Sequence, residues 1–283
     1  MTILVTGGNG QLGSALRLAS ARSSHRYIFT DIEELDITSK RAIEEFIAQN
    51  QIEVVINCAA YTAVDMAEEN EELADKINHQ AVAKIAEVCA DNNATLIHIS
   101  TDYIFDGNTT TPYKEDITPA PLSAYGRTKL LGEQAIAEAK CRAIVLRTAW
   151  LYSEFGRNFV KTMRGLMSSH PEIKVVADQF GTPTYAGDLA NAIVEIIDSG
   201  QYSKYGTYHY SNEGACSWYD FAVEIAKQSN LCDCKVTPCT TADYPTKAVR
   251  PRYSVLDKTK FTMTFGIAIP EWQESLAECI KKF

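Results

Sequence analysis

A strand-like run that leads directly into a glycine-rich turn restricts the fold of this chain more than any other feature. Residues 2–6 (TILVT) are β-branched and apolar, and Gly7-Gly8-Asn9-Gly10-Gln11-Leu12-Gly13 follows them at the start of a helical pattern. Gly7 permits a tight turn, Gly10 lets the backbone approach a pyrophosphate, and Gly13 lets the helix pack closely on the strand. The start of the helix adds free N–H groups for phosphate oxygens. We therefore expect a dinucleotide cofactor at this turn, in contact with Gly7, Gly10, Gln11, Leu12 and Gly13.

Strand-like and helix-like segments alternate through the first 150 residues. Strands are expected at residues 2–6, 26–30, 53–57, 94–99 and 142–148, and helices at 11–22, 40–50, 65–92 and 122–139. This order predicts an α/β fold, with a Rossmann-type doubly wound parallel sheet covered by helices on both faces. We expect residues 1–150 to form an NAD(P)-binding Rossmann domain, to which residues from about 185 to 215 return. Residues 151–184 and 216–283 are expected to form a small C-terminal α/β substrate-binding region.

The charge and composition of the chain argue against several classes of protein. A net charge of −9 and a pI of about 5.1 disfavour general nucleic-acid binding, which needs clustered Lys and Arg. No apolar run reaches the ~20 residues that span a bilayer, and the N-terminus has neither the basic region nor the cleavage site of a signal peptide. We expect a cytoplasmic protein that binds neither nucleic acid nor membrane.

The eight cysteines are expected to be free thiols, because a chain of this size without a secretion signal rarely forms disulfides. Cys232, Cys234 and Cys239 cluster in a loop-like stretch. A zinc pattern usually needs a second matched pair of ligands, which is missing here. We therefore predict no metal site.

Asp31 ends the second expected strand, about twenty residues after the glycines, where this fold places an acid that binds the ribose. Such an acid accepts a hydrogen bond from the 2′-OH and disfavours a 2′-phosphate. No Arg stands beside Asp31 to offset its charge. The residue chemistry therefore favours NADH, or the use of both NADH and NADPH.

Small residues follow the third expected strand, in the segment 57–62 (NCAAYT). They let a cofactor lie across the carboxyl edge of the sheet, where ligands bind in this architecture. Ala59, Ala60 and Thr62 are therefore candidate contacts. Asp36 and Ile37 are candidate contacts to the adenine, and a helix N-cap region near Thr38 is an equally good interpretation of these two residues.

Tyr125 and Lys129 are the expected catalytic pair. The segment 123–129 (SAYGRTK) opens a helix, so the i, i+4 spacing puts both side chains on one face. Reduction of a ketone needs a proton as the hydride arrives, and a phenol has an ordinary pKa near ~10. A nearby ammonium stabilises the phenolate and lowers that pKa, and Lys129 can also bond the nicotinamide ribose. Thr101 or Ser100, at the end of the fourth strand, can hydrogen-bond the substrate oxygen.

Six further motifs are spread over almost the whole chain. They are residues 57–65 (NCAAYTAVD), 100–107 (STDYIFDG), 125–133 (YGRTKLLGE), 147–152 (RTAWLY), 178–184 (DQFGTPT) and 250–254 (RPRYS). Their combination resembles the dTDP-4-dehydrorhamnose reductase family, within the extended short-chain dehydrogenase/reductase superfamily. The spacing Gly7-x-x-Gly10-x-x-Gly13 is also similar to that of the superfamily.

The resemblance implies reduction of the C4 ketone of dTDP-4-dehydro-β-L-rhamnose to dTDP-L-rhamnose, the last step of a route to cell-surface polysaccharide. It implies that Thr101 assists Tyr125, that Trp150 lines the sugar pocket and that Asp102 contacts the substrate. It also implies a preference for NADPH with NADH often accepted, which tempers the inference from Asp31.

Two positions depart from the family pattern. Gly8 stands where many members carry a larger residue, which does not threaten the site. Ala15 stands where some relatives carry an acidic residue that helps to hold Mg²⁺ between subunits. A role for Mg²⁺ is therefore not supported, and the chain is expected to be a monomer or a homodimer.

The diphosphate of a nucleotide-sugar needs positive charge or amide donors. Asn158 and Arg250 are the candidates, and Arg157 and Arg252 are rivals that could equally be solvated surface residues.

Two other functions fit the same motifs. A reductase or epimerase of another nucleotide-linked 4-ketosugar would share them, whereas dehydratases often add an Asp-Glu pair that is missing after Thr101. The fold family also includes a non-catalytic NADP-binding regulatory subunit, and fold alone does not exclude that role. The complete set of Thr101, Tyr125 and Lys129 favours an enzyme.

Overall fold

The computed structural model describes all 283 residues, and its centre is a six-stranded sheet in which every neighbouring pair is parallel. The strands lie in the order β10-β5-β4-β3-β1-β2. Their bounds are Thr2–Thr6 (β1), Arg26–Thr30 (β2), Val54–Asn57 (β3), Thr95–Thr101 (β4), Ala143–Thr148 (β5) and Gly206–His209 (β10). The order reverses between β1 and β3, which is where α/β sheets of this kind bind ligands.

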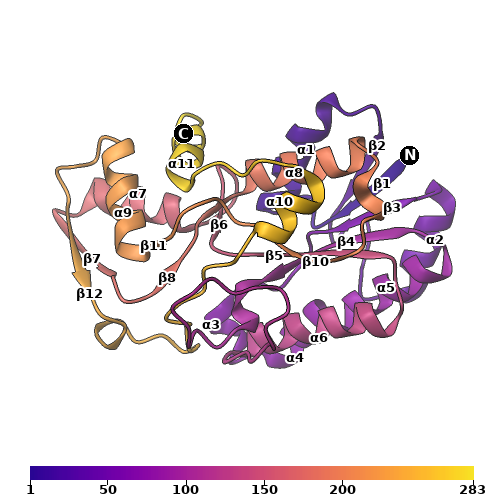
Figure 1. Cartoon of the computed structure of the whole chain (residues 1–283), viewed down its shortest axis with the longest axis horizontal. Coiled ribbons are helices and arrows are strands. Elements are labelled where there is room, and N and C mark those ends of the chain that lie inside the picture. Colours follow the sequence, from indigo (N-terminus) through magenta and orange to yellow (C-terminus); the bar gives the residue numbers. More distant parts are fainter.

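Helices cover both faces of the sheet, as Figure 1 shows. One face carries α1 (Gln11–Ala19), α8 (Ala186–Asp198) and α10 (Thr259–Phe265), and the other carries α2 (Lys40–Asn50), α5 (Ala81–Asp91) and α6 (Ala124–Glu138). The strands are therefore buried on both sides, which explains their near-continuous apolar sequences. The predicted α/β fold with a doubly wound parallel sheet is confirmed.

The helical region expected over residues 65–92 is largely helical in the structure, with one break at residues 68–70. It consists of α3 (Val64–Ala67), then α4 (Glu71–Asp75), which continues through a π-helical turn η2 (Lys76–Gln80) into α5. The π-helical turn contains Asn78, a fully buried amide that bonds the backbone N and O of Tyr61 and the hydroxyl of Thr128. Gly132 lies against the backbone of Asn78 so closely that a Cβ there would overlap it. Tertiary contacts thus widen a turn that local spacing predicts as regular helix.

A smaller group of elements lies beside the sheet, on the left of Figure 1, around a separate apolar core. It contains the helices α7 (Phe159–Ser169), α9 (Trp218–Gln228) and α11 (Trp272–Ile280). Its short strand pairs are β6 (Leu151–Tyr152) with β9 (Thr184–Tyr185), β7 (Glu172–Val176) with β12 (Lys235–Cys239), and β8 (Phe180–Gly181) with β11 (Cys216–Ser217). Short 3₁₀ turns are found at Ser20–Arg22, Asp102–Ile104, Gln201–Ser203 and Thr241–Asp243. No helix combines the length and the apolar character needed to cross a bilayer.

Strand β12 is not among the expected elements, and it contains Pro238, a residue type that sheets accept mainly at their edges. Proline lacks the N–H that a central strand must donate. β12 pairs with β7 alone, so it is an edge strand, and the missing N–H breaks no second ladder. The edge position of β12 is therefore what makes a proline acceptable in this strand.

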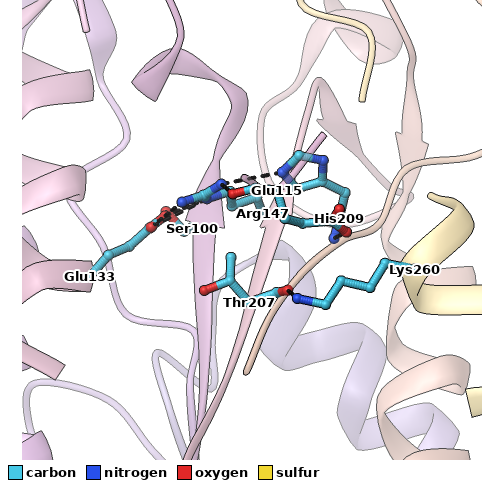
Figure 2. Close-up of polar contacts among 7 residues, drawn as sticks. All are labelled: Ser100, Glu115, Glu133, Arg147, Thr207, His209 and Lys260. Carbon is cyan, nitrogen blue, oxygen red and sulfur yellow. Dashed lines mark hydrogen bonds and ion pairs between the residues drawn. The ribbon is translucent and has the colours of Figure 1, made fainter. Parts of the chain in front are cut away.

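A buried ion pair ties the sheet to α6 (Figure 2). The Arg147 guanidinium on β5 donates from Nη2 to Glu133 Oε2 at 2.7 Å and from Nε to Glu133 Oε1 at 3.0 Å. Ser100 on β4 donates its hydroxyl to the same carboxylate. The Arg147 and Glu133 side chains are only 7% and 8% exposed. On the other side of Arg147 lies His209, with Nε2 at 3.4 Å from Nη1.

We predict that Glu133→Gln lowers the free energy of unfolding by roughly 2–4 kcal/mol, because it leaves the buried Arg147 charge without a carboxylate. The matched control is Glu45→Gln, which removes a carboxylate from the exposed Arg41–Glu45 pair on α2. Urea denaturation followed by circular dichroism should show a lower midpoint for the first variant and an unchanged one for the control. Equal midpoints for both variants would mean that water screens the Arg147 pair.

Candidate active site

A cavity of about 580 Å³ opens at the carboxyl edge of the sheet, beside the point where the strand order reverses. The glycine-rich turn and the ends of β3, β4 and β5 form one side, and the start of α7 and Trp218 of α9 form the other. Most of the predicted site residues line it: Gly7, Gly10, Gln11, Leu12, Gly13, Ala60, Thr62, Thr101, Asp102, Tyr125, Lys129, Trp150, Asn158 and Arg250. Four do not: Asp31, Asp36, Ile37 and Ala59.

The glycine-rich turn brings the backbones of β1, α1 and Ala59 very close together. Gly7 has φ of +65°, and a Cβ there would lie 2.7 Å from the backbone N of Ala59. A Cβ on Gly13 would overlap the carbonyl oxygen of Gly7, so α1 approaches β1 more closely than any side chain permits. No side chain caps α1 at Gly10, which leaves the N–H groups of the first turn free to bind an anion.

The four residues outside the cavity wall have identifiable local contacts. Asp31 directly follows β2, next to the glycine-rich turn, and accepts hydrogen bonds from the N–H of Asn9 at 3.0 Å and of Ile32 at 2.9 Å. Asp36 accepts from the backbone and the hydroxyl of Thr38, and Ile37 packs into the core beneath α2. Ser39 caps α2, so Asp36 and Ile37 lie in the N-cap region expected near Thr38.

Ala59 packs against Gly7, and its contact with a cofactor stays a prediction, as do those of Asp31, Asp36 and Ile37.

Tyr125 and Lys129 lie in the first two turns of α6, which Ser123 caps by accepting from the N–H of Gly126. The Lys129 ammonium is buried and donates to the carbonyl of Ile99 on β4 at 2.6 Å. Burial lowers the pKa of Lys129 to about 8, against a smaller opposing effect of the nearby Glu133 carboxylate.

Burial raises the pKa of the Tyr125 phenol, and the neighbouring Thr101 hydroxyl opposes that rise. No hydrogen bond joins Tyr125 to Lys129, so the expected influence of the ammonium on the phenol stays a prediction.

Asp102 is a buried carboxyl at the wall of the cavity, 2% exposed. The Thr101 hydroxyl donates to its Oδ1 at 3.1 Å and accepts from the N–H of Tyr103 at 3.2 Å. The other oxygen, Oδ2, has no hydrogen-bond partner. Burial raises the pKa of Asp102 to about 6 from an ordinary 3.8. The group is therefore poised to take up a hydrogen bond at the cavity.

Two cavity residues could meet an anionic ligand. Arg250 donates from Nη1 to the Tyr103 hydroxyl at 2.9 Å and from Nη2 to Asp65 Oδ2 at 2.8 Å, so its charge is held at the cavity wall. Asn158 caps α7, and its Nδ2 donates to Gln11 Oε1 at 2.9 Å. That bond joins the glycine-rich turn to the smaller group of elements.

Of the two rival arginines, Arg157 lines the cavity and Arg252 does not.

Trp218 lines the cavity and is absent from the expected site residues. Its indole stacks on Trp150 with a centroid distance of 3.5 Å and an interplanar angle of 10°. Trp150 has φ of +47°, and a Cβ on Gly181 would lie 2.6 Å from its Cε2. Nothing in the local sequence around Trp218 signals this contact, because it depends on the packing of α9 against the end of β5.

A family model described as the RmlD substrate binding domain matches residues 1–283. The dTDP-4-dehydrorhamnose reductase of Aggregatibacter actinomycetemcomitans is 41% identical, over 97% of this chain and 96% of that protein. A crystal structure of a dTDP-4-dehydrorhamnose reductase from Clostridium acetobutylicum is 46% identical with a TM-score of 0.95, over 99% of both chains. That of the Bacillus anthracis enzyme, in complex with NADP, is 37% identical with a TM-score of 0.94, over 100% of this chain and 99% of that chain.

We predict that Asp102→Asn stabilises the fold increasingly as the pH rises from 4.5 to 7. The folded protein binds the Asp102 proton more tightly than the unfolded chain, so wild-type stability falls as the pH rises between the two pKa values. The difference in unfolding free energy between variant and wild type should grow by roughly 2 kcal/mol over this interval. Urea denaturation at both pH values measures it, with the exposed Asp116→Asn as the matched loss of a carboxylate. A difference that does not change with pH would refute the prediction.

Proposed function

The chain belongs to the dTDP-4-dehydrorhamnose reductase family of NAD(P)H-dependent oxidoreductases, and we propose that it reduces the C4 ketone of dTDP-4-dehydro-β-L-rhamnose with Tyr125 as the proton donor. The product is dTDP-L-rhamnose, a precursor of cell-surface polysaccharide. One observation carries the proposal: Thr101, Tyr125 and Lys129 line the same cavity as the glycine-rich turn. The turn proposed to bind the cofactor and the proposed proton donor therefore face the same cavity, as hydride transfer to a protonated product requires.

The nicotinamide cofactor, when bound, supplies the hydride. The free N–H groups of the first turn of α1 would hold its pyrophosphate, with Gly7, Gly10 and Gly13 giving the close approach. NADP accompanies the Bacillus anthracis relative, so NADPH is the expected donor, with NADH as a second donor.

Three side chains of the protein supply and stabilise the proton transfer. The Tyr125 phenol donates its proton to the oxygen of C4 as that oxygen gains negative charge. The Thr101 hydroxyl, which donates its single proton to Asp102 Oδ1 in the structure, turns on substrate binding and donates it to the same oxygen. The buried Lys129 ammonium favours the phenolate that remains, because an opposite charge in a region of low dielectric constant stabilises an anion strongly.

Arg250 and Asn158, which line the cavity, are proposed to bind the diphosphate, and Trp150 and Asp102 to contact the sugar. The unpartnered Oδ2 of Asp102 supports a hydrogen bond from a sugar hydroxyl.

We predict that Tyr125→Phe lowers kcat by about 10²–10⁴-fold while the affinity for NADPH is retained, because only the proton donor is removed. Tyr61→Phe is the matched control, since Tyr61 packs near Tyr125 but does not line the cavity. NADPH oxidation is followed at 340 nm with dTDP-4-dehydrorhamnose made in situ. Full turnover by Tyr125→Phe would remove Tyr125 from the mechanism. A wild-type protein that binds NADPH but never oxidises it with this substrate would refute the proposed function.

We predict that Asp31→Asn raises the NADPH-to-NADH ratio of kcat/KM by about tenfold, since it removes a negative charge expected to face the 2′-phosphate. Glu33→Gln, an exposed residue of the same loop, is the matched control. A ratio that Asp31→Asn leaves unchanged would show that Asp31 does not meet the ribose.

A further inference from the structure

A row of buried polar side chains crosses the sheet beneath α6. Thr6 on β1, Asn57 on β3 and His98 on β4 are register partners on three adjacent strands. Two residues earlier the partners are Leu4, Val55 and Leu96, which point to the same face and belong to the apolar core. The face is thus apolar along most of its length and turns polar in one transverse row. Each member of that row is at most 2% exposed.

The row leads to Lys129. The Thr6 hydroxyl lies 2.7 Å from Asn57 Oδ1, Asn57 Nδ2 lies 3.1 Å from His98 Nδ1, and His98 Nε2 lies 3.3 Å from Lys129 Nζ. Burying polar groups is unfavourable unless each finds a partner, and apolar residues would hold the sheet together at least as well. The proposed function does not otherwise use these three side chains. Lys129 is the only residue of the proposed catalytic set that the row contacts.

Which atoms of the row carry protons depends on the charge of Lys129. Burial, with the nearby ammonium, lowers the pKa of His98 well below its ordinary value, so the imidazole is neutral and has one N–H and one lone pair. An ammonium can only donate, so a charged Lys129 requires an accepting Nε2 and a proton on Nδ1. The Asn57 amide must then point its oxygen at His98 and its NH₂ at Thr6. This is the reverse of the arrangement in the structure, where the Thr6 hydroxyl donates to Asn57 Oδ1 and Asn57 Nδ2 faces His98 Nδ1. The arrangement in the structure puts the His98 proton on Nε2 and corresponds to an uncharged Lys129 amine, so the orientation of the row follows the charge of Lys129.

We propose that His98, oriented by Asn57 and Thr6, is a positioning residue that holds the Lys129 ammonium in place and sets the pH range over which Lys129 stays charged. The proposal rests on the role of Lys129 in the proposed function. His98 acts through Lys129, because it does not line the cavity itself.

The other titratable groups that face Lys129 are less suited to this task. Tyr125 and Glu133 share α6 with it, and Glu133 is already paired with Arg147 and Ser100. Cys58 follows β3, and burial raises the pKa of its thiol to about 12, which leaves it neutral. Besides the Ile99 carbonyl, His98 is the only polar contact of the Lys129 ammonium.

The first test is the pH dependence of kcat/KM for wild type, His98→Leu and His98→Gln, measured by NADPH oxidation with dTDP-4-dehydrorhamnose. Leucine cannot accept a hydrogen bond, so the charged form of Lys129 loses support and the alkaline limb should move down by about one pH unit. Glutamine presents an amide oxygen and should return the limb towards the wild-type position.

His209→Leu is the matched control, because His209 is a second buried histidine that contacts Arg147 and not Lys129. The His209→Leu variant should keep the alkaline limb of the kcat/KM profile at the wild-type pH. If His98→Leu lowers the rate by the same factor at every pH, His98 is merely structural and the proposal is overturned.

A second readout needs no destabilising variant. In the wild-type protein labelled with ¹⁵N-histidine, His98 should carry its proton on Nδ1 below the alkaline limb and on Nε2 above it. The loss of one set of signals in His98→Gln identifies the residue. A His98 that keeps its proton on Nε2 at neutral pH overturns the proposal.

The two proposals fail differently. If Tyr125→Phe abolishes reduction but His98→Leu leaves the alkaline limb of the kcat/KM profile at the wild-type pH, only the role of His98 is refuted. If wild type does not reduce the ketosugar, the proposed function fails, and the tautomer measurement still reports on the coupling of His98 to Lys129.

Discussion

The burial of one ammonium group, that of Lys129, is the constraint on which much of this structure depends. A charged amine inside a protein is unfavourable unless polar atoms surround it, and here the Ile99 carbonyl and His98 do so. Both come from β4, so α6 must lie directly on the sheet. Gly126 and Gly132 let α6 approach two neighbouring turns, because a Cβ at these positions would overlap the backbone of Tyr103 and of Asn78. The same close approach carries Tyr125 to the cavity.

A second buried charge holds α6 from another side. Glu133, one turn after Lys129, receives the guanidinium of Arg147 on β5 and the hydroxyl of Ser100 on β4. The helix is thereby joined to two adjacent strands by groups that cannot move without leaving a buried charge unpaired. The proposed proton donor thus projects from a rigid element, which is what precise positioning of a reacting group requires.

The sequence predicted the sheet well, because glycines and apolar strands act locally. The turn from Gly7 to Gly13 forms as expected, since its steric requirement lies within a few residues. The helical region over residues 65–92 was predicted without its widened turn at Asn78, whose side chain contacts Tyr61 and Thr128, residues far from it in sequence. Asp36 accepts hydrogen bonds from Thr38 in the N-cap region of α2, and its contact with the adenine stays a prediction.

The amino-acid sequence by itself determined the fold class, the family and the residue types available for hydride and proton transfer, because these depend on periodicity, on short motifs and on resemblance. Only the tertiary structure decided which side chains share a cavity and what surrounds each of them. Trp218 stacks on Trp150, and His98 meets Lys129, through the packing of elements far apart along the chain. Burial also comes from packing between distant elements. It raises the pKa of Asp102 and lowers that of Lys129, because neighbouring elements exclude water from both groups. No local sequence pattern encodes that exclusion.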